Sequence, residues 1–267
     1  MIQEGFTFYQ PHEALREYVR FYWVFRSYRT VSALTFPVGC PQIIFHKRKP
    51  LYIPELNSFQ SSLTISGQVN FPSHLNTTGK TEMIVVVFKP YGLSPFLNIP
   101  ASLFYNQEVS GYDIDDKGLH GLDGRISECV DDIDSIKLID NWLLSRIVSR
   151  VDYQTQRIKA AVNQIFTVPQ TPVSDLAATA CLGKKQFERS FRSLVGINPK
   201  EYARIVRFQR ALALTRSGES GLGQIAYASG YSDQSHFIRE FKRFSGLTPT
   251  TLLKTTNANS DLFSNPV

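Results

Sequence analysis

The stretch Leu222–Pro249 constrains the fold of this 267-residue chain more than any other part of the sequence. Small and apolar residues share one face of a short predicted helix that is broken at Gly230. After that break, phenylalanines recur at spacings of four and three residues, which predicts a second helix with one apolar stripe: Phe237, Phe241 and Phe244. The pattern is therefore helix, tight turn, helix, followed by a Gly-x-x-Pro stop.

The same pattern occurs upstream, in Val173–Pro199. Leu176-Ala177 matches Ile225-Ala226 at an offset of 49 residues, and the later anchors match at an offset of 50. The later pairs are Phe187 with Phe237, Arg189 with Arg239, Phe191 with Phe241, Gly196 with Gly246 and Pro199 with Pro249. One helical hairpin is a weak signal, but a shared register is strong because chance must supply every anchor. The sequence predicts two helix-turn-helix units, 173–199 and 222–249.

The second unit resembles the signature of the AraC/XylS family of bacterial transcription regulators. The matching residues are Ile225-Ala226, Gly230-Tyr231-Ser232-Asp233-Gln234-Ser235-His236-Phe237, Phe241-Lys242-Arg243, Gly246 and Thr248-Pro249. The resemblance implies an all-α, AraC-type DNA-binding domain over residues 151–254, with a long helix at 199–217 joining the two units. It also implies RNA polymerase as a partner if the protein activates transcription.

The net charge of +6 is placed unevenly along the chain. Residues 1–150 hold 14 Lys and Arg against 15 Asp and Glu, a net charge of −1, whereas residues 151–267 hold 15 against 8, a net charge of +7. A basic domain attracts polyanions. Double-stranded DNA is therefore the expected partner of the second half.

The first residues of each second helix are the candidates for reading bases, because the major groove accepts one α-helix. Arg and Lys suit the acceptors of guanine, and Gln suits adenine. The candidates are Lys184, Lys185, Gln186 and Arg189 in the first unit and Gln234, Ser235, His236 and Arg239 in the second. A phosphate contact is the alternative for each, since half to two-thirds of protein–DNA hydrogen bonds go to the backbone. Asp233 is expected to cap its helix.

Basic residues further along the helices are expected to contact phosphates: Arg192, Arg204, Arg207, Lys242 and Arg243. For Arg204 and Arg207, the family resemblance also implies an alternative role, which is to brace the two units. Two units on one rigid helix would place both recognition helices on one DNA face, about 34 Å apart.

Residues 1–150 are predicted to be rich in short strands. Tyr18–Tyr28 is dense in aromatic and β-branched residues, and further candidates follow at 33–36, 42–46, 51–53, 62–67 and 83–88. No helix of βαβ length separates them, so the sheet should be mainly antiparallel. The predicted fold class is α+β in two domains: a β-barrel with flanking helices, then the helical domain. Residues 255–267 are predicted to be a disordered tail.

Two short segments, Phe36–Cys40 and Phe88–Gly92, resemble the cupin-like β-barrel that senses a small molecule in many AraC-type regulators. That resemblance implies a small-molecule effector. The alternative is an N-terminal domain that serves only oligomerisation or protein contacts. Metal-binding cupins use a His-x-His pair, which the five histidines do not form, so no metal or cofactor is expected: His12, His46, His74, His120 and His236.

No enzymatic activity is expected. Three widely spaced cysteines give neither a disulfide framework nor a zinc site: Cys40, Cys129 and Cys181. Repair methyltransferases that carry this type of helix-turn-helix use a cysteine in a Cys-His-Arg context, and Cys40 lacks it. The sequence has neither a signal peptide nor the roughly 18–20 apolar residues of a membrane helix, so a cytoplasmic protein is expected.

Residues 133–148 are predicted to form an amphipathic helix, with one side lined by Ile136, Ile139, Leu143 and Ile147. In the family that the sequence resembles, helices between the two domains commonly pair two subunits, which implies a homodimer. The alternative is that this stripe packs on its own domain.

Overall fold

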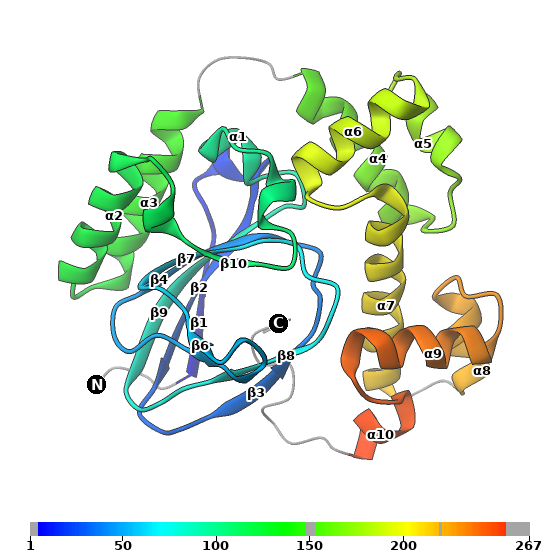
Figure 1. Cartoon of the computed structure of the whole chain (residues 1–267), viewed down its shortest axis with the longest axis horizontal. Helices are drawn as coiled ribbons and strands as arrows, with labels where there is room; N and C mark the ends of the chain where they lie inside the picture. The colour runs from blue at the N-terminus through cyan, green and yellow to red at the C-terminus, as the bar shows by residue number, and fades with distance from the viewer. Residues whose placement is uncertain (1–4, 148–152, 219–220, 255–267) are drawn as a thin grey trace.

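The computed structural model describes residues 5–147, 153–218 and 221–254. An N-terminal domain of sheets and helices, residues 5–147, lies beside a helical C-terminal domain, residues 153–254 (Figure 1). The predicted two-domain α+β fold is confirmed. The expected boundary at residue 150 and the tail at 255–267 lie outside the described residues.

The strands form two antiparallel sheets. The larger has the order β1-β2-β9-β4-β7-β10 and the smaller has the order β3-β8-β5-β6. The strands are β1 Gly5–Tyr9, β2 Val19–Ser27, β3 Ser32–Thr35, β4 Gln42–His46, β5 Tyr52–Ile53, β6 Ser58–Phe59, β7 Leu63–Ser66, β8 Ser73–Asn76, β9 Thr81–Phe88 and β10 Glu108–Ser110. The described ladders do not join the two sheets. The antiparallel pairing is therefore confirmed, whereas a closed cupin-like barrel is not.

Helices cover the end and the outer face of the larger sheet. Figure 1 shows α2 and α3 side by side on the side away from the C-terminal domain. The helical segments are η1 Glu13–Leu15, η2 Pro54–Leu56, α1 Ser94–Leu97, η3 Ala101–Phe104, η4 Gly111–Asp113, α2 Lys117–Glu128 and α3 Asp132–Arg146. Arg26 of β2 forms an ion pair with Asp132 in the first turn of α3, and it also pairs with Glu82 of β9 at 3.2 Å. These pairs fasten α3 to the sheet.

The apolar stripe of α3 packs on its own domain. Ile136, Ile139 and Leu143 are buried in the same cluster as residues of β2, β4 and β9, and Ile147 packs against that cluster. This packing fits the alternative in which the stripe covers its own domain, and pairing of two subunits through this helix stays a prediction.

The C-terminal domain consists of helices around a phenylalanine-rich core. Its helices are α4 Tyr153–Thr167, α5 Val173–Thr179, α6 Lys184–Val195, α7 Pro199–Ser217, α8 Leu222–Ala228, α9 Gln234–Ser245 and α10 Pro249–Lys254. The repeated phenylalanines are fully buried, as their spacing predicts: Phe187, Phe191, Phe237, Phe241 and Phe244. Gly196 and Gly246 end α6 and α9 with φ of 98° and 74°, a conformation that favours glycine. No described helix has the length and apolar character needed to cross a membrane.

The apolar core of the C-terminal domain continues into the N-terminal domain. The Phe36 ring lies edge-on to Phe208 of α7, with the ring centroids 6.0 Å apart. Polar contacts flank this pair: Gln209 donates to the carbonyl of Pro37, and the Tyr105 hydroxyl donates to Glu201 at 2.7 Å. The N-terminal domain therefore contacts the C-terminal domain along α7.

Phe208 is the residue whose loss should damage this arrangement most. Its ring lies 5.3 Å from the rings of both Phe241 and Phe244, besides Phe36. Phe208→Ala is expected to lower the free energy of unfolding by about 3–5 kcal/mol, because a buried ring leaves a cavity. Urea unfolding measures this loss. Phe59→Ala, at a side chain that is 59% exposed, is the control and should cost much less. Equal losses in the two variants would contradict a central role for Phe208.

Candidate nucleic-acid interface

The two predicted recognition helices, α6 and α9, lie at opposite ends of α7 (Figure 1). Helix α7 has 19 residues, so its axis is about 28 Å long. Helix α6 directly precedes it, while α8 and α9 pack against it further along, with α9 contacting Arg204, Arg207 and Phe208. One continuous helix therefore sets the separation between the two recognition helices.

The first turns of α6 present the predicted base-reading residues to solvent. Lys184, Lys185, Gln186 and Arg189 are exposed, and none of the four makes a hydrogen bond or ion pair with the described part of the chain. On the opposite face of α6, Phe187 and Phe191 are buried. The helix is thus anchored by its apolar side and leaves these polar side chains available to a ligand.

Helix α9 begins with the cap that its sequence predicts. Asp233 accepts a hydrogen bond from the backbone N–H of His236 at 2.8 Å, and this bond is the main cause of the lowered pKa of Asp233. Gln234, Ser235 and Arg239 are exposed, like their counterparts in α6.

His236 differs from the other candidates because it is held within its own unit. Its Nδ1 lies 3.1 Å from the Ser232 hydroxyl, and its ring lies edge-on to Tyr231 with the centroids 5.3 Å apart. The side chain is half-buried as a result. His236 therefore lies at the start of α9 as predicted, but its side chain is engaged by neighbours. Gln234 and Arg239, in contrast, are exposed.

Glu240 binds both of the arginines that the sequence analysis assigned to phosphates. Arg204 Nε donates to Glu240 Oε1, and Arg207 lies 3.3 Å from Oε2. The Glu240 side chain is 7% exposed, so this pair of contacts is largely screened from water. Arg207 also lies 5.3 Å from the ring centroid of Tyr231, whose pKa is raised by burial. These contacts fit the alternative role of a brace between α7 and α9.

Sequence reasoning missed Glu240. The available signal is that Glu240 is the only acidic residue of the helix 234–245, which is otherwise basic and aromatic. The remaining predicted phosphate contacts are exposed on later turns of α6 and α9: Arg192, Lys242 and Arg243. Of these, Arg243 lies 5.9 Å from the ring centroid of Phe244.

The interior of the N-terminal domain holds a buried polar chain. His46 Nε2 lies 2.8 Å from Gln60 Oε1, and Gln60 Nε2 donates to Glu108 at 2.6 Å. Burial lowers the pKa of His46 to about 4 and raises the pKa of Glu108, because it disfavours the charged form of each side chain. The cavity beside this chain holds only about 70 Å³. Among the described residues, no group of three or more His, Cys, Asp and Glu is arranged to hold a metal ion.

Two family matches divide the chain as its fold does. Residues 176–255 match a family described as a helix-turn-helix domain, and residues 7–110 match DUF6597, a domain of unknown function. The regulator LumQ of Photobacterium leiognathi is 36% identical over 78 residues, which are 29% of this chain and 32% of LumQ. An AraC-like transcription regulator of Streptomyces lividans is 35% identical over 77 residues, 29% of this chain and 25% of that protein.

The chain thus spans a quarter to a third of the length of these relatives, which are named as transcription regulators and not as enzymes. The crystal structure of ToxT from Vibrio cholerae O395 is 15% identical and covers 88% of this chain and 97% of that one, with a TM-score of 0.45. Together with the repeated signature and the buried phenylalanine register, the helix-turn-helix match identifies residues 176–255 as a helix-turn-helix domain of the AraC type.

Proposed function

We propose that the protein binds double-stranded DNA in a sequence-specific manner, with α6 and α9 in successive major-groove segments, and thereby regulates transcription. The observation that carries this proposal is the placement of the two recognition helices at the two ends of α7, each with exposed polar side chains on its first turns (Figure 1). The major groove accepts one helix at a time, so each unit serves one segment.

The length of α7 supports this spacing. Successive major-groove segments on one face of DNA lie about 34 Å apart. The axis of α7 is about 28 Å long, which is of the same order as that spacing. A single chain therefore suits an asymmetric site that spans two segments.

The first unit is the better candidate for choosing the sequence. Its four candidate side chains are exposed and form no hydrogen bond within the described residues. The lysines and the arginine suit the acceptors of guanine, and the glutamine suits adenine. In the second unit, His236 is engaged with Ser232 and Tyr231. We therefore assign base readout mainly to α6, and a larger share of the phosphate contacts to α9.

We also propose that the N-terminal domain modulates DNA binding. Its segment η3 packs against α6, and the Pro72 ring would lie 3.6 Å from a methyl group placed on Gly246, at the end of α9. Both units thus contact the same domain, so a change in that domain has a direct route to the spacing of the two recognition helices. A small-molecule effector is the input that we favour.

Base readout by α6 can be tested by substitution of its exposed basic residues. DNA selected from a random pool by the full-length protein provides the specific ligand. Lys185→Ala and Arg189→Ala are each expected to weaken binding to that DNA by about 1–3 kcal/mol, and to weaken binding to random DNA much less. Lys137→Ala on α3 removes the same charge from an exposed position far from α6 and serves as the control. Titrations on both DNAs at fixed salt measure the difference.

An equal loss on selected and random DNA would reassign Lys185 and Arg189 to phosphate contacts. A hydroxyl-radical footprint of the wild-type protein tests the spacing separately. Protection of two segments about 34 Å apart by one chain is expected. Protection of a single segment would overturn the two-segment proposal.

A further prediction concerns the Glu240 brace. Glu240→Ala leaves two partly buried guanidinium groups without their carboxylate, and it should lower the free energy of unfolding by about 2–3 kcal/mol. It should also weaken protection of the α9 segment in the footprint while protection of the α6 segment remains. The control is Glu188→Ala, which removes from α6 a carboxylate that forms no ion pair within the described residues. If Glu240→Ala were as stable as Glu188→Ala, the brace would have no structural role.

A further inference from the structure

A cavity of about 610 Å³ lies between the two domains, far larger than the space inside the N-terminal sheets. Cavities that bind small molecules usually measure about 300–1,000 Å³. The walls come from β2 and the segment after β9 on one side and from α4 and α7 on the other. A molecule in this cavity would therefore touch both domains at once, whereas the 70 Å³ interior space is too small for an organic ligand.

The charged groups of this cavity are all basic. Arg20 and Lys89 come from the N-terminal domain, and Lys159 and Arg210 come from the C-terminal domain. Among the described lining residues there is no carboxylate. Lys89 and Lys159 are close enough that each repels the other, and this repulsion adds to burial in lowering the pKa of Lys89. The cavity therefore favours an anion.

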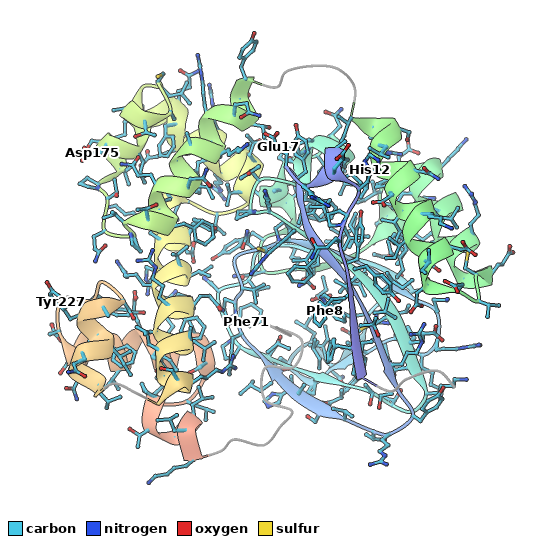
Figure 2. All side chains as sticks on the ribbon, turned by 180° about the vertical axis from the view of Figure 1, so that it is seen from behind. Phe8, His12, Glu17, Phe71, Asp175 and Tyr227 are labelled. Carbon is cyan, nitrogen blue, oxygen red and sulfur yellow. The ribbon has the colours of Figure 1, made fainter. Side chains whose placement is uncertain are left out.

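Glu17 shows how an anion is held at the rim of this cavity. Its carboxylate accepts hydrogen bonds from Lys159 at 3.0 Å and from Gln156, both on α4. The bond from Lys159 is the main cause of its lowered pKa. Figure 2 labels Glu17 on the side of the N-terminal domain that faces the C-terminal domain, where its partners lie on α4. Glu17 also lies near enough to Lys89 for their charges to attract, so one carboxylate faces two of the four cations and net positive charge remains for a second anion.

The rest of the cavity is apolar and aromatic, with one buried polar atom. Tyr91, Val162, Phe166 and Ile205 line it. Tyr202 also lines it and is fully buried, yet its hydroxyl has no hydrogen-bond partner within the described residues. Buried hydroxyls are normally hydrogen-bonded, so the Tyr202 hydroxyl is an exception that lies beneath the cavity wall, out of reach of water.

We infer that this interdomain cavity is a binding site for an organic anion with an apolar body, held by Lys89 and Lys159 at the charged end and by the aromatic wall at the other. Binding of the anion does not require DNA. The role of this cavity as the effector site rests on the proposed function, because a ligand that touches both domains would change the contacts between the N-terminal domain and the units that carry α6 and α9.

Two fluorescent probes with the same rings test this inference on the full-length protein. The sulfonate 1-anilinonaphthalene-8-sulfonate carries the charge, and N-phenyl-1-naphthylamine is its uncharged parent. The wild-type protein should bind the sulfonate at least about tenfold more tightly than the parent, because a charged hydrogen bond contributes on this scale. Lys89→Gln and Lys159→Gln should each remove about tenfold of the sulfonate affinity and leave the affinity for the parent unchanged.

Matched variants separate the site from general effects of charge and folding. Lys137→Gln removes one positive charge on α3 and should leave both affinities unchanged. Lys89→Arg retains the charge and should retain sulfonate binding. Ala213→Trp, at an exposed position of α7 that lines the cavity, should block both probes, and it decides the question if the glutamine variants fold poorly.

Equal affinity of the wild-type protein for the two probes would overturn the inference, and so would sulfonate binding that the Lys89, Lys159 and Ala213 variants leave unchanged. DNA titration of the same variants without probe tests the proposed function independently. None of the three positions lies on α6 or α9, so specific DNA binding should survive in all of them.

Discussion

The fold of the C-terminal domain depends on the packing of α7, which contacts both helix-turn-helix units and the N-terminal domain. Phe208 shows this most clearly, since its ring meets Phe36 on one side and the phenylalanines of α9 on the other. On the outer side, Arg204 and Arg207 of the same helix hold Glu240 of α9. A helix fixed on several sides acts as a rigid spacer, and the proposed binding to two groove segments requires such rigidity.

The sequence was sufficient to predict the C-terminal domain because its determinants are local. The phenylalanine spacing, the glycine at each helix end and the Asp233 cap act within a few residues of one another, and the first unit repeats the phenylalanines and the glycine. The unpaired, exposed side chains of α6 follow from the same periodicity, because residues opposite a buried stripe face water.

The features that the sequence did not predict are those set by contacts between distant segments. The stripe of α3 has the spacing of a surface that pairs two chains, but Arg26 and Asp132 turn that surface onto the sheet, 106 residues away in sequence. The pairing of Glu240 with Arg204 and Arg207 likewise spans more than 30 residues. Sheet closure depends on strand order, which alternation of apolar residues does not encode. Periodicity predicts which face of an element is buried and not which partner covers it.

The position of the basic cavity would couple a bound ligand to the helices that support the first helix-turn-helix unit. Lys159 lies on α4, which packs against α5 and α6, and Arg210 lies on α7, so an anion held there would bear on the helices that position α6. In the structure, Lys159 already forms an ion pair with Glu17 of the N-terminal domain. A ligand anion and Glu17 would share the same lysine, and binding would weaken one interdomain ion pair while adding contacts to both domains. A ligand changes a conformational equilibrium only when it binds one conformation more tightly than the other. Competition between Glu17 and the ligand for Lys159 would make the affinity depend on how the two domains are arranged.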